Sequence, residues 1–169
     1  SAASRVLPPW ALLNRDIVPL LAKEAILEKI ARAFRANIMF CANTYHEGKM
    51  RLWLVRHGET EANVAGLYSG HAPTPLTGRG VKQAQTLNTL LSQVPFEQVL
   101  CSELERAQHT ARLVLQGREL PLQVKPELNE MFFGDWEMRH HRDLTHEDAD
   151  NYAAWCNDWH NAVPTNGEG

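Results

Sequence analysis

The stretch Leu52-Trp53-Leu54-Val55-Arg56-His57-Gly58-Glu59-Thr60 indicates the fold class. Its first four residues form a short continuous apolar run, which is typical of a strand buried on both faces of a parallel sheet. The run leads directly into charged and polar residues. Because open α/β sheets bind ligands beyond the carboxyl ends of their strands, we expect His57 to lie in a functional site.

Strand-like and helix-like segments alternate from Met50 onward. Short apolar runs are typical of buried strands, whereas apolar residues three or four apart predict helices. The segments in chain order are a helical pattern over 77–91, an apolar run at 99–101, a helical pattern over 102–114, a strand-like run at 120–124 and a helical pattern over 145–159. This alternation predicts an α/β domain with a mostly parallel sheet.

Three of these helices carry signals for their first residues. Thr77 is a suitable N-cap, because its hydroxyl can accept a hydrogen bond from a free backbone N–H. The stretch Ser102-Glu103-Leu104-Glu105 has the pattern of a capping box, and residues 145–148 resemble one. We expect the second helix to begin at Ser102 and the last helix at Thr145. Trp155 and Trp159 lie on one face of that last helix, either in its core or as a stacking platform for an aromatic ligand.

Composition excludes several functional classes. The chain has 169 residues and a formal net charge of −3, which disfavours a general nucleic-acid binder. The apolar-leaning stretch from Ile17 to Phe40 is interrupted by six charged residues, so we expect no membrane span there. Residues 1–13 lack the apolar core of a secretory signal. The three cysteines are far apart and form no CxxC pair, which favours free thiols and a cytoplasmic location.

Residues 1–49 differ in sequence pattern from the rest of the chain. They open with Pro8-Pro9, carry one helical pattern with an apolar face between Leu20 and Ile38, and end in a polar run over 43–49. We predict a helical N-terminal extension of unknown role over 1–49 and a single domain over 50–169. The oligomeric state is left open by the sequence.

Chemistry-bearing residues follow three of the predicted strands. His57 follows the first strand, Arg106 lies on the first turn of the helix after the second, and Glu130 follows the third. Arg56 stands beside the histidine. Two guanidinium groups offer bidentate hydrogen bonds to phosphate oxygens. We also expect them to hold His57 neutral by charge repulsion, which leaves an imidazole lone pair free to attack phosphorus.

An ordered series of motifs carries a resemblance to one family. The motifs are Arg56-His57-Gly58-Glu59-Thr60, Asn63, Leu76-Thr77, Gly80, Gln83-Ala84, Ser102-x-Leu104-x-Arg106-Ala107-x-x-Thr110 and Glu130-x-x-Phe133-Gly134-x-Trp136-Glu137. Together they resemble the histidine phosphatase (phosphoglycerate-mutase-like) superfamily over 50–169. The resemblance implies a three-layer α/β/α fold. The stretches 66–75, 128–141 and 164–169 resemble members that remove a 5′-phosphate from a nucleotide.

The resemblance also implies roles for single residues. His57 is implied as the nucleophile that becomes phosphorylated, and Glu130 as the general acid that protonates the leaving oxygen. Arg56 and Arg106 complete the implied catalytic set. The implied substrate-binding residues are Asn63, Gly70, Arg56 and Arg106. The implied substrate is a small phosphorylated molecule, with no metal and no cofactor.

Two departures from the family pattern bear on function. The family's second half supplies a later strand that ends in another pocket histidine, and no histidine after the Glu130 segment follows an apolar strand. The second departure is residues 1–49, which have no counterpart in the family, because its members begin near the position of Met50. We therefore expect a fragment that lacks the C-terminal part, with Met50 as the natural start. The alternatives are a phosphoglycerate mutase, a broad-specificity phosphatase and a non-catalytic phospholigand-binding module. The stretch Phe133-Gly134-Asp135-Trp136-Glu137 has the phosphatase form and disfavours the mutase.

A histidine group after the Glu130 segment raises the question of a metal site. It consists of His140, His141 and His146. Neighbouring side chains on an extended loop point apart, so we expect the two adjacent histidines to diverge. No carboxylate–histidine helix spacing supports ligation either. We predict that these residues hold no metal, and contact with the rim of the substrate site is an alternative role.

Overall fold

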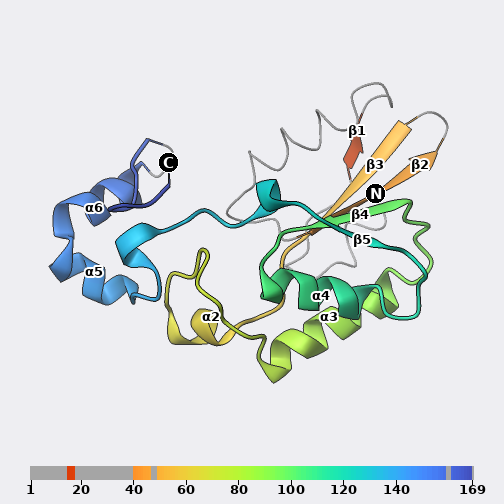
Figure 1. Cartoon of the computed structure of the whole chain (residues 1–169), viewed down its shortest axis with the longest axis horizontal. Helices are drawn as coiled ribbons and strands as arrows, with labels where there is room; N and C mark the ends of the chain where they lie inside the picture. Colours follow the sequence, from red (N-terminus) through yellow and green to blue (C-terminus); the bar gives the residue numbers. More distant parts are fainter. Residues whose placement is uncertain (1–14, 18–39, 47–48, 159–160, 169) are drawn as a thin grey trace.

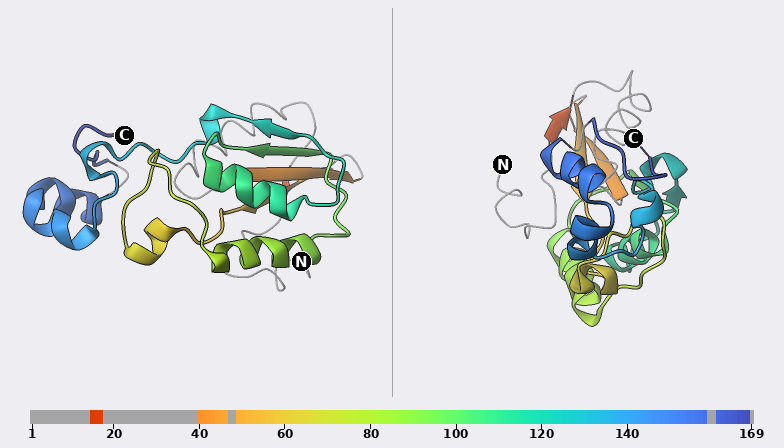
Figure 2. Two further views of the ribbon diagram at one scale, coloured as in Figure 1. Left: turned by 60° about the horizontal axis from the view of Figure 1, so that its bottom comes forward. Right: turned by 90° about the vertical axis from the view of Figure 1, so that its left-hand side faces the viewer.

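The computed structural model of the chain describes residues 15–17, 40–46, 49–158 and 161–168. The described part has an α/β architecture. A sheet lies over two helices, α3 (Gly78–Leu90) and α4 (Glu105–Val114), which pack side by side against the same face (Figures 1 and 2). The sheet and this pair of helices form two of the three layers of the predicted fold.

The described sheet has the strand order β1-β3-β2-β4-β5. The strands are β1 (Arg15–Ile17), β2 (Phe40–His46), β3 (Lys49–Val55), β4 (Gln98–Cys101) and β5 (Leu122–Val124). β4 and β5 pair in parallel, and β3 runs in the same direction because both β3 and β4 are antiparallel to β2. The three strands after residue 48 are therefore parallel to one another, as predicted for this domain.

The described sheet as a whole is mixed, because strands from before residue 49 join the parallel strands of the predicted domain. Both β1 and β2 run antiparallel to β3, and β2 lies between β3 and β4. Only two residues separate β2 from β3 in the sequence. Such a short connection can join only antiparallel neighbours, because a parallel pair needs a crossover of a dozen or more residues.

The N-terminal extension contributes both antiparallel strands. β2 includes residues 43–46 of the polar run over 43–49. The helix predicted between Leu20 and Ile38 lies outside the described residues. The division of the chain at residue 49 stays a prediction, and the structure adds that strands from before that residue share a sheet with those after it.

A hydrophobic core joins the sheet to the two helices. Trp53 and Val55 of β3 pack with residues of β4, α3 and α4, and the ring of Trp53 meets that of Phe96 edge to face at 6.0 Å. The buried helical residues of this core are Ala84, Leu87, Ala111 and Val114. This packing fixes the position of the carboxyl end of β3 relative to the first turn of α4.

The helix starts agree only in part with the predicted caps. The hydroxyl of Thr77 accepts a hydrogen bond from the N–H of Gly80 at 3.1 Å, as expected. α4 begins at Glu105 without a side-chain cap, so the predicted capping box is wrong. The hydroxyl of Ser102 instead accepts from the N–H of Leu104 at 3.3 Å. This bond within a turn replaces the bond that a capping box needs.

A second group of elements extends away from the sheet (Figures 1 and 2). It contains α2 (Glu61–Ala65), α5 (His141–Glu147) and α6 (Ala149–Asn157), with Thr145 inside α5 and not at a helix start. An aromatic cluster packs α6 against the preceding loops, and its members are Tyr68, Phe133, Trp136, Tyr152 and Trp155. Trp155 therefore belongs to a core, whereas Trp159 lies outside the described residues. Among the helices that the structure describes, none is long and apolar enough to cross a membrane.

Candidate functional site

His57 follows β3 directly and is buried, with 6% of its surface exposed. Its Nδ1 lies 2.6 Å from the carbonyl oxygen of Gly58. A carbonyl can only accept, so Nδ1 carries the proton in this bond and Nε2 keeps its lone pair. Burial, together with the smaller effects of the positive charges of Arg106 and Arg56, lowers the pKa of His57 from 6.5 to about 4, against the opposing effect of the hydrogen bond to Gly58. The imidazole is therefore neutral near pH 7, as expected, although burial contributes more than the arginines.

The backbone after His57 is held by α3 and α4. The N–H of Gly58 donates to the hydroxyl of Thr110 at 3.0 Å, and that hydroxyl donates to the carbonyl of Arg106 at 2.8 Å. A Cβ on Gly58 would lie 2.5 Å from the carbonyl oxygen of Gly80, so only glycine allows this approach to α3. Thr110 thus couples the histidine loop to the helix that carries Arg106.

Arg106 lies in the first turn of α4 and is 2% exposed. Its Nη2 donates to the carbonyls of Ser69 at 2.7 Å and Gly70 at 2.5 Å, and its Nη1 donates to that of Ala72 at 3.1 Å. We call residues 69–72 the clamp loop. The fork was expected to be free for phosphate, but a buried guanidinium needs partners for its donors, and the carbonyls of the clamp loop supply them.

Two of the five N–H donors of Arg106 remain, the Nε–H and the second N–H of Nη1. Its Nε is buried and has no hydrogen-bond partner among the residues that the structure describes. Burial lowers the pKa of Arg106, and the carboxylates of Glu130 and Glu137 oppose that effect. A buried N–H without a partner is costly, and an incoming anion is one group that would satisfy it.

Glu130 follows the 3₁₀ turn η3 (Pro126–Leu128) and is 7% exposed. Burial raises its pKa to about 8, against the opposing attraction of Arg106 and Arg56. The carboxyl group is therefore mostly protonated at neutral pH, which is the state that a general acid requires. The ring Nε2 of His71 lies 2.8 Å from the backbone carbonyl of Glu130 and donates to it, which places the clamp loop beside this segment.

The other predicted site residues, Arg56, Asn63 and Gly70, differ in whether their polar groups are already hydrogen-bonded within the protein. Arg56 is exposed and acts electrostatically on both His57 and Glu130. Asn63 forms a reciprocal capping box with Thr60 at the start of α2. Its side-chain NH₂ has no partner within the described part of the chain. The N–H of Gly70 is already donated to Glu137, so an amide contact from Gly70 to a substrate would require that bond to break.

The structure thus brings Arg106 close enough to both His57 and Glu130 to affect the pKa of each. The sequence reasoning assigned no role to Thr110, His71 or Glu137. Thr110 and Glu137 belong to the quoted motifs, but the motif alone does not say which backbone groups they bind. No local pattern marks His71, because its partner lies 59 residues away.

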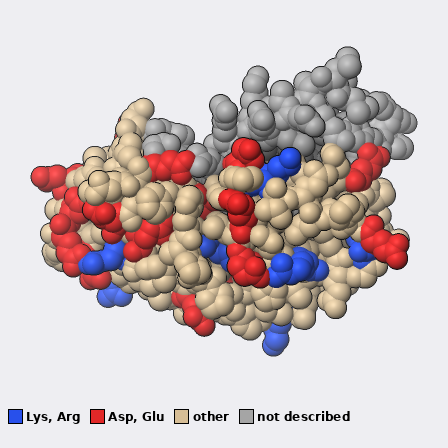
Figure 3. All heavy atoms as spheres, viewed as in Figure 1, with Lys and Arg blue, Asp and Glu red and all other residues tan. Residues whose placement is uncertain are grey.

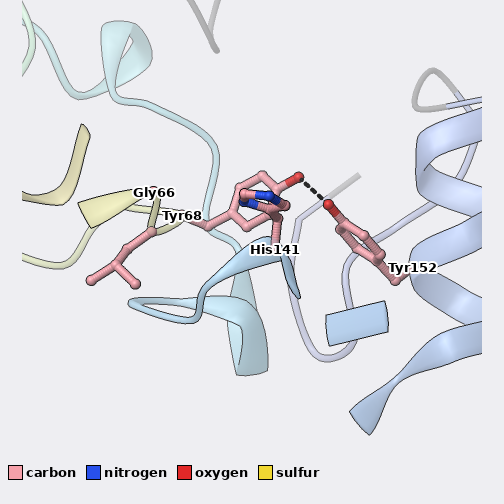
Figure 4. Close-up of a pocket in the computed structure, with 5 residues that line it drawn as sticks. Gly66, Tyr68, His141 and Tyr152 are labelled. Atoms are coloured by element: carbon pink, nitrogen blue, oxygen red, sulfur yellow. Dashed lines mark hydrogen bonds between the residues drawn. The ribbon is translucent and has the colours of Figure 1, made fainter. Parts of the chain in front are cut away.

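A separate hollow of about 210 Å³ lies between the α2 end and the α5–α6 pair (Figure 4). It is lined by Gly66, Leu67, Tyr68, His141 and Tyr152, and the two tyrosine hydroxyls lie 3.1 Å apart. None of these residues belongs to the predicted site.

The rings of His140 and His141 lie side by side, with centroids 4.2 Å apart. This corrects the expectation that they diverge. The physical reason is that His141 is already the first residue of α5, and the ring of His140 caps this helix, accepting from the N–H of Arg142 at 3.0 Å. Within the described ranges, no group of three or more His, Cys, Asp or Glu residues is placed to hold a metal ion.

Comparison with known proteins agrees with this geometry. The family model of the histidine phosphatase superfamily (branch 1) matches residues 52–169. The adenosylcobalamin/alpha-ribazole phosphatase of Salmonella typhimurium is 80% identical over 120 residues, covering 71% of this chain and 59% of that protein. Its Escherichia coli counterpart is 78% identical over the same length.

A solved structure agrees with the fold. The crystal structure of the alpha-ribazole phosphatase from Shigella flexneri is 77% identical and superposes with a TM-score of 0.64. The superposition covers 67% of this chain and 56% of that one. The chain therefore spans a little under three fifths of the length of the relatives that it matches.

Proposed function

We propose a phosphomonoesterase function for this chain, which belongs to the histidine phosphatase superfamily (branch 1). The substrate of the whole protein is alpha-ribazole 5′-phosphate or adenosylcobalamin 5′-phosphate, which it hydrolyses to the free alcohol and inorganic phosphate. This places it in the assembly of the cobalamin nucleotide loop. The names of the Salmonella typhimurium and Shigella flexneri relatives support this substrate class.

The observation that carries the proposal is the state of His57. A buried imidazole with its Nδ1–H donated to Gly58 offers the lone pair of Nε2, and its lowered pKa keeps that lone pair free of a proton at neutral pH. Nucleophilic attack by Nε2 on phosphorus forms a phosphohistidine and releases the substrate's 5′-oxygen. This divides one difficult hydrolysis into two easier steps.

Positive charge next to His57 serves the same step. Arg106 and Arg56 are the cations that act on the imidazole. Their role is to bind the phosphoryl oxygens, with the buried Nε of Arg106 as one donor and the NH₂ of Asn63 as another. Donors that are already in place where negative charge develops give the largest single contribution to many enzymatic rates.

Glu130 supplies the proton transfers. Its raised pKa keeps the carboxyl protonated, so it can protonate the departing 5′-oxygen as the phosphohistidine forms. The resulting carboxylate then removes a proton from the water that attacks the phosphohistidine, which returns Glu130 and His57 to their starting states. The proton given in the first step is therefore regained in the second.

Surface charge and the state of the cysteines bear on the kind of partner and on the cellular compartment. Acidic side chains gather over α5 and α6 (Figure 3), which disfavours a nucleic-acid partner on this face and favours a small substrate. Cys101 is buried and Cys156 exposed, and both are free thiols, which supports a reducing compartment such as the cytoplasm. No metal or cofactor enters the proposed steps.

Trapping the phosphohistidine tests the proposal. The full-length protein should carry acid-labile, alkali-stable phosphate on His57 when it is quenched during turnover of a labelled phosphomonoester. The label should be absent in His57→Asn and retained in the control His146→Asn, which removes an exposed histidine of α5. Turnover without any label, or a label on another residue, contradicts the proposal. Phosphate binding without turnover identifies a non-catalytic module instead.

A further inference from the structure

Glu137 joins two loops that lie far apart in the sequence. Its Oε2 accepts from the backbone N–H groups of Gly70 at 3.0 Å and Ala72 at 3.3 Å. Its Oε1 accepts from those of His71 at 2.8 Å and Phe133 at 3.1 Å. Four backbone donors use about all the lone pairs of one carboxylate, and hydrogen bonds to a charged acceptor are stronger than neutral ones.

The clamp loop binds Glu137 with its N–H groups and Arg106 with its carbonyl groups. The N–H groups of the loop point to the carboxylate of Glu137, whereas its carbonyls accept from the guanidinium of Arg106. The loop is therefore held between one anion and one cation. Neither charge touches the other in a direct ion pair, so the position of Arg106 depends on the conformation of the loop.

The clamp loop also packs against the segment that contains Glu130. His71 donates to the backbone carbonyl of Glu130, and a Cβ on Gly70 would overlap the carbonyl oxygen of Met131. Only glycine permits this approach. The loop thus touches both the Arg106 side chain and the Glu130 segment, and Glu137 is the side chain that fixes its N–H groups.

We propose that Glu137 is a positioning residue that fixes Arg106 for phosphate binding through the clamp loop. For the identity of the anion, this inference rests on the proposed function. Both N–H groups of Nη2 and one of Nη1 are donated to carbonyls of the loop, so the buried Nε–H and the second N–H of Nη1 are the donors left for phosphoryl oxygens. Glu137 acts through the loop and does not itself contact the phosphate.

The direction in which Glu137→Gln changes phosphate affinity distinguishes a positioning role from a purely electrostatic one. Glu137→Gln removes a negative charge near an anion site, and by Coulomb's law alone this should tighten phosphate binding. Its amide keeps one acceptor oxygen and replaces the other with an NH₂ that cannot accept. If Glu137 positions Arg106, the loss of bonds to the loop should instead weaken phosphate binding, by about tenfold or more, as expected for the loss of charge-assisted hydrogen bonds.

The experiment compares three versions of the 169-residue chain, namely the unaltered chain, Glu137→Gln and the control Glu147→Gln. Glu147 pairs with Arg139 on the exposed side of α5, so the control makes the same charge change away from the clamp loop. Amide hydrogen exchange of residues 70–72 and the ¹H–¹⁵N signal of Arg106 Nε are measured by NMR. Titration with inorganic phosphate then gives the dissociation constant.

We expect faster exchange of the 70–72 amides, a shifted or broadened Arg106 Nε signal and weaker phosphate binding in Glu137→Gln, with no such changes in Glu147→Gln. Phosphate binding that is unchanged or tighter in Glu137→Gln overturns the inference. A loosened loop with an unchanged Arg106 Nε signal also overturns it. If the unaltered chain binds no phosphate, the proposed phosphate site fails, and the exchange and Nε measurements alone decide whether Glu137 positions Arg106.

Discussion

The backbone of Gly80 packs directly against the backbone of Glu59. A Cβ on Gly80 would overlap the carbonyl oxygen of Glu59 and lie 2.9 Å from its nitrogen. The same carbonyl accepts from the N–H of Thr77 at 2.9 Å, so the start of α3 is fixed on the loop that follows His57. Because this approach leaves no space for a side chain, glycine at position 80 sets the distance between α3 and the candidate site.

Replacing Gly80 should therefore cost stability, whereas replacing its neighbour Gly78 should not. Gly78 lies in the same first turn of α3, and nothing would lie within 4 Å of its added Cβ. We expect Gly78→Ala to stabilise the chain by about 0.4–1 kcal/mol through reduced freedom of the unfolded state. Gly80→Ala should destabilise it by about 1–3 kcal/mol, as overpacking does. Denaturant unfolding measures both, and equal effects of the two substitutions would contradict the predicted contact.

The buried carboxyl of Glu130 should make stability depend on pH. Its pKa is raised from 4.5 to about 8 on folding, so the folded state binds the extra proton and stability falls as pH rises through this range. The pKa of His57 falls from 6.5 to about 4, so His57 has the opposite effect between pH 4 and 6.5. The two effects oppose each other below pH 6.5, and a net loss of stability is expected between about pH 6.5 and 8.

Glu130→Gln should abolish that loss, because the amide stays neutral at every pH. The measurement is the free energy of unfolding from denaturant titrations at several pH values. Glu127→Gln, which changes an exposed carboxylate on η3, is the matched control and should keep the pH dependence of the unaltered chain. A Glu130→Gln variant that still loses stability between pH 6.5 and 8 would show that another group titrates there.

Catalysis by Glu130 should depend on the leaving group. In the full-length protein, Glu130→Gln should slow hydrolysis of an alkyl phosphate such as alpha-ribazole 5′-phosphate by about 10²–10⁴-fold. Aryl phosphates should lose much less, because their leaving groups depart without protonation. Steady-state rates on the two substrate classes test this. Equal losses on both would assign Glu130 a structural role.

The 169-residue chain should bind phosphate but turn over slowly. It spans 59% of the Salmonella typhimurium relative, and the family resemblance implies a further pocket histidine in the unmatched part. Loss of one donor to the transition-state oxygens typically costs about 10²–10³ in rate. Side-by-side assays of the chain and the full-length Salmonella typhimurium protein on alpha-ribazole 5′-phosphate measure the difference. Matching rates would mean that a residue of this chain replaces the missing donor.

Local sequence signals accounted for much of the candidate site. His57 follows an apolar strand, and the spacing after the second strand places Arg106 in the first turn of α4. The carboxyl ends of parallel strands meet at one edge of a sheet, so short-range patterns suffice to predict that these residues come together. The N-cap of α3 at Thr77 was predictable for the same reason, because a cap involves only neighbouring residues.

Features that depend on distant partners could not be predicted in this way. The polar run over 43–49 gives no hint that β2 inserts between β3 and β4, because strand pairing is decided by the partners available in space. The predicted capping box at Ser102 is likewise absent. The turn before α4 also binds a distant residue, because Asn129, which follows the third strand, accepts from the N–H of Glu103 at 2.8 Å.

The sequence alone determined the α/β class and the superfamily and predicted the candidate site residues, because each depends on short motifs and local periodicity. Only the tertiary structure decided what state those residues adopt. Burial makes His57 neutral and keeps Glu130 protonated, and the clamp loop commits the fork of Arg106 to backbone carbonyls. The free energies of charge and hydrogen bonding depend on solvent exclusion and on partners dozens of residues away, which emerge only when the chain is folded.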